Sequence, residues 1–166
     1  MILPKKSSLI VDYEKIKRDT FILLNLGYGL NRFQDDDEGD VRSRSSANIF
    51  LDYGHNYEAI VSEKLISISI SARILDDKIS KIIPTLSASN FSFEEFIGDD
   101  SDGNLLNLRQ CFNKVIHSVS MEHELLHLPE IYLSGEHTNC REWHVRIFIL
   151  PFCSAVYQWL TECANA

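Results

Sequence analysis

Apolar residues recur along much of this chain at intervals of three and four positions, the spacing that predicts amphipathic helices. The series over 105–120 consists of Leu105, Leu108, Phe112, Val115 and Val119. Two further series predict a helix over 13–27 and another that begins near Pro151. Asp12 is placed to cap the first of these two helices, and Gly27 is expected to end it.

The segment 57–81 carries two competing patterns. Residues 66–71 alternate apolar and polar side chains, as a strand does. Over the wider window the apolar positions recur every four and three residues: Val61, Leu65, Ile68, Ala72, Leu75, Ile79 and Ile82. Because this second pattern persists for three heptads, we predict one helix, packed on the helix at 105–120. Pro84 should end it, and residues 47–53 either belong to it or form a separate turn.

Two extended segments follow at 130–136 and 141–150, where apolar and polar residues alternate. Gly135 and Asn139 supply turn residues between them, so the two segments are predicted to form a β-hairpin. The face that should pack on the helices carries Trp143, Val145, Ile147 and Ile149. The opposite face, with Tyr132, His144 and Arg146, is either a polar edge or a surface for RNA or a protein partner.

The C-terminal helix has its own apolar stripe, formed by Phe152, Val156, Trp159, Leu160 and Cys163. Together these patterns predict a mainly α fold, a helical bundle with a C-terminal β-hairpin followed by a closing helix. We expect one domain over residues 1–166, with a flexible tail at 1–8 and a linker at 85–104 within the domain.

The chain has 166 residues and a net charge of −8, which argues against a broadly basic surface for nucleic acid. Its four cysteines are far apart and form no CxxC pair: Cys111, Cys140, Cys153 and Cys163. Such cysteines indicate reduced thiols. The N-terminal segment has the pattern of neither a signal peptide nor a membrane span. We therefore expect a cytoplasmic protein without membrane contact. No glycine-rich phosphate loop is present in the sequence, and we expect no cofactor.

The helix predicted over 105–120 also has a polar side. At about 100° per residue, His117 falls roughly opposite the apolar stripe, and Asn113 lies one turn before it on the same side. Arg109 lies one turn further back, and Lys114 adds a second cation. The helix should therefore bury one side and present these four residues on the rest of its surface.

The run Leu-Arg-Gln-Cys-Phe-Asn-Lys-Val-Ile-His at 108–117 resembles the last core helix of HEPN-like proteins. That family is defined by an Arg, often followed by Asn, then three residues and a His, and Asn113-Lys-Val-Ile-His117 matches the second half of this pattern. Phe112 occupies the position where an active member carries the Arg. Arg109 lies further from His117 than the family's usual gap. The hairpin and terminal helix that follow are also similar to some compact HEPN-like proteins.

In active HEPN-like proteins two copies usually face each other and cut RNA without metal. The resemblance implies that His117 is the acid and base at the ribose 2′-OH and that Asn113 orients it. Arg109 or Lys114 would then steady the phosphate in place of the missing Arg.

Other HEPN-like proteins are catalytically silent subunits of toxin–antitoxin, phage-defence and other nucleic-acid-related assemblies. The displaced Arg and the acidic balance of the chain favour this second role. We therefore expect a catalytically weak or silent interaction subunit that forms a homodimer through the face of the central helix and that binds RNA or a protein partner. The metal-independent endoribonuclease is the alternative.

A third interpretation comes from His-Glu-Leu-Leu-His at 123–127, which fits the H-E-x-x-H pattern of zinc hydrolases. On a helix, His123 and His127 would bind the metal and Glu124 would act as the general base. Pro129 leaves little room for such a helix, and the flanking residues read as extended structure. We rank this alternative below the other two and expect a connecting segment with solvated histidines and no bound metal.

Overall fold

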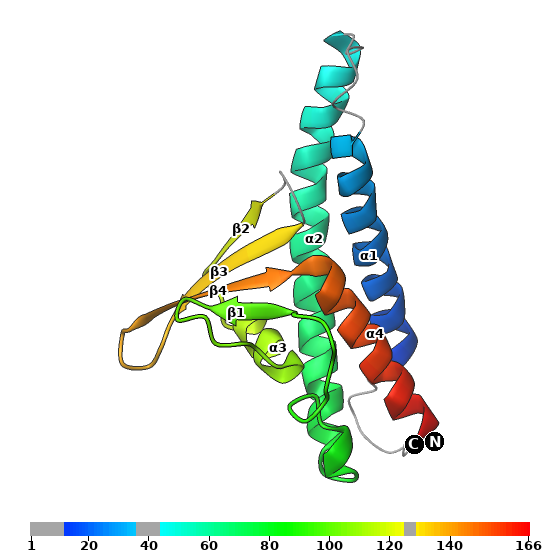
Figure 1. The fold of residues 1–166 in the computed structure, drawn as a ribbon, viewed down its shortest axis with the longest axis vertical. Helices are drawn as coiled ribbons and strands as arrows, with labels where there is room; N and C mark the ends of the chain where they lie inside the picture. Colours follow the sequence, from blue (N-terminus) through cyan, green and yellow to red (C-terminus); the bar gives the residue numbers. More distant parts are fainter. Residues whose placement is uncertain (1–11, 36–43, 125–128) are drawn as a thin grey trace.

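The structure is a computed structural model that describes residues 12–35, 44–124 and 129–166. In chain order its elements are α1 (Tyr13–Asp35), α2 (Arg44–Ile79), the 3-10 helix η2 (Pro84–Leu86), β1 (Gly98–Asp100), α3 (Leu108–Ile116), β2 (Ser120–Glu124), β3 (Glu130–Glu136), β4 (Glu142–Phe148) and α4 (Ile149–Asn165). The helices α1, α2 and α4 lie side by side, and the sheet projects to one side of them, with α3 next to α2 (Figure 1).

The mainly helical character and the C-terminal order of strand followed by helix are confirmed. The β structure is larger than the predicted hairpin, because the described strands form a four-stranded antiparallel sheet in the order β1-β4-β3-β2. The tail expected at 1–8 lies outside the described residues. In the part of the chain that is described, no helix has the length and apolar character needed to cross a bilayer.

The long helical seam is the best-predicted feature. From Val61 to Ile79 its members are all buried, and residues 47–53 belong to the same helix. The end of the helix was predicted too late: α2 stops at Ile79, and Ile82 is 62% exposed. The helix ends here because the backbone N–H groups of Ile82 and Ile83 both donate to the carbonyl of Ile79 and close a turn.

The start of α1 is confirmed, since Asp12 Oδ1 accepts a hydrogen bond from the backbone N–H of Lys15 at 3.0 Å. Its predicted end at Gly27 is wrong, because the helix continues to Asp35. Gly27 is buried instead against α4, where an added Cβ would lie 2.6 Å from Leu150 Cδ2. A glycine at this position allows two helices to approach closely and does not end the helix.

The core lies between the helices and the inner face of the sheet. The predicted stripe of α4 is buried in full. There the ring centroid of Phe112 lies 6.0 Å from that of Phe152 and 5.9 Å from that of Trp159. Polar contacts between helices add to this core. Asp19 of α1 accepts hydrogen bonds from Lys15 at 2.6 Å and from Ser67 of α2 at 3.0 Å.

The hairpin of β3 and β4 is confirmed, with Leu133 paired to Val145 and alternate residues buried. The stretch expected to be a linker at 85–104 contains η2 and β1, which pairs with β4. Gly135 is not a turn residue as predicted. It lies in β3 beneath Trp143, and an added Cβ would come within 2.3 Å of the indole and 2.8 Å of the carbonyl oxygen of His117.

These glycine environments generate a matched prediction. Gly135→Ala should lower the free energy of unfolding by about 1–3 kcal/mol, because the methyl group would overlap the indole and a backbone carbonyl. Gly54→Ala in α2 should raise it by about 0.5–1 kcal/mol, because nothing lies within 4 Å of the new Cβ and alanine favours the helix. Urea denaturation of both variants tests this, and a neutral Gly135→Ala would contradict the packing described here.

Candidate functional site

The central helix α3 is shorter than predicted. It begins at Leu108 because Asn107 and Gln110 form a capping box: Asn107 Oδ1 accepts from the backbone N–H of Gln110, and Gln110 Oε1 accepts from the backbone N–H of Asn107. Leu105 and Val119, expected on the buried stripe, lie outside the helix and are 68% and 77% exposed. The Asn-x-x-Gln signal was readable in the sequence and would have given the correct start.

The apolar side of α3 is confirmed for Leu108, Phe112 and Val115, which are buried. Phe112 has no exposed surface and contacts Phe152 and Trp159 of α4. This is the position at which the HEPN-like pattern has its Arg. Position 112 therefore points into an aromatic core, where a guanidinium would be desolvated without a partner.

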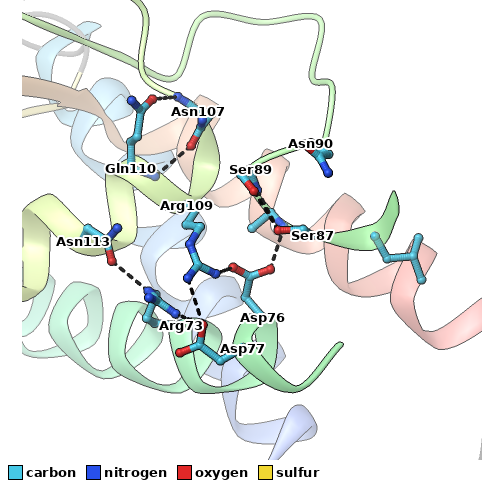
Figure 2. Close-up of polar contacts among 12 residues, drawn as sticks. Arg73, Asp76, Asp77, Ser87, Ser89, Asn90, Asn107, Arg109, Gln110 and Asn113 are labelled. Carbon is cyan, nitrogen blue, oxygen red and sulfur yellow. Dashed lines mark hydrogen bonds and ion pairs between the residues drawn. The ribbon is translucent and has the colours of Figure 1, made fainter. Parts of the chain in front are cut away.

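Arg109 does not face solvent as predicted but binds two carboxylates of α2. Its Nη1 forms an ion pair with Asp76 Oδ2, and its Nη2 lies 2.9 Å from Asp77 Oδ1. The side chain of Asp76 is fully buried, and its Oδ1 also accepts a hydrogen bond of 2.8 Å from the backbone N–H of Ala88. Figure 2 shows the guanidinium between the two carboxylates. Burial opposes the charge of Arg109, but Asp77 and Asp76 outweigh it and raise the pKa of Arg109.

Asn113 is also turned towards α2 and not towards His117. Its Oδ1 accepts a hydrogen bond of 2.8 Å from Arg73 Nε, and the Arg73 guanidinium forms a further ion pair with Asp77 (Figure 2). The hydrogen bond from Arg73, with a second one from Arg109, holds the pKa of Asp77 below its ordinary value despite partial burial. An unbroken polar network thus joins Asp76 to Asn113.

The other two candidate residues point elsewhere. Lys114 Nζ lies 4.0 Å from the centroid of the Trp143 ring on β4, and desolvation there lowers the pKa of Lys114. His117 is exposed, as predicted, but it is the C-cap residue, and its backbone N–H donates to the carbonyl of Asn113. Arg109 and His117 are eight positions apart, about 12 Å along a helix. One chain therefore does not bring the four predicted catalytic residues together.

Sequence reasoning missed the α2 side of this network. The spacing of Arg73 and Asp77 is that of a helical ion pair, so this part was readable. The buried Asp76 was not, because its partner Arg109 is 33 residues away in sequence.

The His-Glu-Leu-Leu-His segment begins in a strand, not a helix. His123 and Glu124 are neighbours in β2, so their side chains point to opposite faces of the sheet. His123 is half-buried against α2, where a 2.9 Å hydrogen bond joins its Nε2 to Ser62 Oγ, so the solvated histidine expected at this position is wrong. His127 lies outside the described residues. Among the residues with described positions, no three His, Cys, Asp or Glu side chains form a metal-binding group.

The open face of the sheet carries Tyr132, His144 and Arg146, as predicted, around an open hollow of about 440 Å³. Arg146 is not available to a phosphate, because its Nε and Nη2 donate to the two carboxylate oxygens of Asp99 at 3.1 and 2.8 Å. Asp100 and Glu122 also line the hollow. This balance of charge disfavours the approach of an RNA backbone to this face.

Comparison with protein-family models, curated proteins and solved structures finds no significant match for the chain.

The network around Arg109 predicts a structural phenotype. Arg109→Ala should lower the free energy of unfolding by about 3–5 kcal/mol, because it leaves the Asp76 carboxylate buried without its counter-ion. Asp77→Ala, at a side chain that is half exposed, should cost about 1 kcal/mol or less. Denaturant unfolding followed by circular dichroism measures both. Equal effects of the two substitutions would show that the buried pair is not the anchor of α3.

The position of His123 predicts a pH dependence. Desolvation lowers the pKa of His123 below its ordinary value of 6.5, with Glu58 opposing. The unfolded chain therefore binds this proton more tightly, and stability should be full above about pH 7 and fall as the pH drops towards the lowered pKa. His123→Asn should flatten this slope in denaturation measured at about pH 7.5 and 5.5. A His123→Asn variant that keeps the wild-type slope would contradict this role of His123.

Proposed function

We propose that this protein is a catalytically silent, HEPN-like interaction subunit of a nucleic-acid-related assembly of the toxin–antitoxin or phage-defence type. The family assignment rests on the resemblance of residues 108–117 to the HEPN-like motif. The silent role rests on the surroundings of the residues that would have to catalyse.

One observation carries the proposal, namely the pairing of both terminal nitrogens of Arg109 with Asp76 and Asp77. Stabilising a phosphate in a transition state requires guanidinium N–H groups that are free to donate. Withdrawing Arg109 would leave the buried carboxylate of Asp76 unpaired, at a cost of about 3–5 kcal/mol. A phosphate would have to offset this cost before it gained anything from Arg109.

Lys114, the second candidate cation, and position 112, where the HEPN-like pattern has its Arg, support the same conclusion. Lys114 is placed over the Trp143 ring, and Phe112 is enclosed by the rings of α4. The acidic lining of the open sheet face also disfavours the approach of a phosphate backbone. These surroundings support a role in protein–protein contact.

The decisive measurement is RNA cleavage. Purified protein incubated with mixed RNA, with and without EDTA, should give no fragments with 5′-hydroxyl ends, because the two cations expected to assist His117 are engaged elsewhere, Arg109 with Asp76 and Asp77 and Lys114 with Trp143. His117→Ala should behave as the wild type does.

Two outcomes would contradict the proposal in different ways. EDTA-resistant cleavage that disappears in His117→Ala would establish the metal-independent endoribonuclease. A zinc content of about one ion per chain that is lost in His123→Ala would instead promote the zinc hydrolase.

A further inference from the structure

Helix α2 has a second apolar side besides its buried seam. Ile66 and Ile70 each lie about 160° around the helix from the fully buried Ile68. They are 39% and 44% exposed, in the middle of a helix whose opposite side is in the core. A surface helix normally keeps one apolar stripe and a polar back, so these two isoleucines indicate that something else covers this side.

The two isoleucines belong to a groove and not to an isolated spot. The groove has a volume of about 360 Å³, and its other wall runs from the end of α3 to the start of β2, with Ile116, Val119 and Met121. Val119, among the most exposed of the large apolar residues described, stands at this edge. Apolar residues from three elements therefore converge on one surface.

Charged residues flank the isoleucines in a symmetric order. Along α2 the sequence of outward positions is Glu63, Ile66, Ile70 and Arg73, at intervals of three, four and three residues. We call these four residues the outer strip. The side chain of Glu63 is 70% exposed, and that of Arg73 is 26% exposed. In the reverse direction the strip has the same spacing of residues, but it begins with the positive charge of Arg73 and ends with the negative charge of Glu63.

We propose that the outer strip and the groove beside it form the contact surface between two copies of this chain, with α2 of one copy antiparallel to α2 of the other. About a two-fold axis near position 68, Ile66 of each copy meets Ile70 of the other, and Glu63 meets Arg73. A two-fold contact uses the same patch on both subunits and must be self-complementary, which this order of charges satisfies. A parallel arrangement would place like charges opposite each other.

The chemistry of the strip favours a second copy over other partners. An RNA backbone would find Glu63 at one end, and its phosphates gain nothing from isoleucines. Within one copy Arg73 pairs with Asp77, and Glu63 pairs with Lys64 at 3.0 Å, so contact between Glu63 of one copy and Arg73 of the other would join two existing ion pairs into one network. This inference rests on the proposed role as an interaction subunit and deepens it by naming one partner and its surface, which lies on α2 and not on the central-helix face that the sequence suggested.

Sedimentation velocity over a concentration series tests the proposal. The wild type should sediment as two chains of 19.1 kDa. Ile66→Glu and Ile70→Glu should each weaken self-association by at least about tenfold, because each places a charge at the centre of the contact on both copies. Ile82→Glu is the matched control, since this isoleucine is exposed but lies outside the groove, and it should associate as the wild type does.

A charge exchange tests the orientation. Glu63→Arg alone should weaken self-association, because it places two arginines opposite each other, and so should Arg73→Glu alone. A mixture of the two variants should form mixed dimers in preference to either self-dimer, because both contacts are then between opposite charges. Circular dichroism checks that Arg73→Glu folds; if it does not, the isoleucine variants decide the question.

A monomeric wild type would overturn the inference, and so would a dimer that is unchanged by Ile66→Glu and Ile70→Glu. Neither result bears on whether the protein cleaves RNA. Cleavage by an intact dimer would refute the silent role and leave this interface standing.

Discussion

The carboxylate of Asp76 is fully buried, and a buried charge is tolerated only where it is paired and hydrogen-bonded. Arg109 supplies the opposite charge, and the backbone N–H of Ala88 supplies a hydrogen bond. These three groups belong to α2, to α3 and to the segment after η2. The requirement to satisfy one carboxylate therefore sets how three separate parts of the chain meet. The position of α3, in turn, places Phe112 in the aromatic core and leads the chain into β2.

The same requirement bears on function. A guanidinium that neutralises a buried carboxylate is part of the fold, whereas a catalytic guanidinium must keep its donors directed at the position where charge develops on the substrate. Asn113 is committed in the same way through Arg73. A helix can therefore carry residues of the types found in a nuclease motif and still use most of them to attach itself to its neighbour. Residue identity and spacing alone do not distinguish these two uses.

The stretch of alternating isoleucine and serine at 66–71 illustrates how one helix serves several neighbours. Ile68 enters the core seam, Ser67 donates a hydrogen bond to Asp19 of α1, and Ile66 and Ile70 remain on the outside. The alternation that resembles a strand is the result of a helix with partners on different sides. Because the seam extends over three heptads, the helical period prevails over the local alternation.

Elements whose signals are local were predictable from the sequence alone. Periodicity gave the seam of α2, the stripe of α4 and the hairpin of β3 and β4, and Asp12 marked the start of α1. The tertiary structure added β1, a three-residue strand that exists through pairing with the distant β4, and the pairing of the five-residue β2 with its neighbour β3. It also decided that Gly27 and Gly135 are close-packing positions and that Arg109 is an anchor. The physical reason is the same in each case: a pattern along the chain states which side of an element is buried, but not which residues will lie against it.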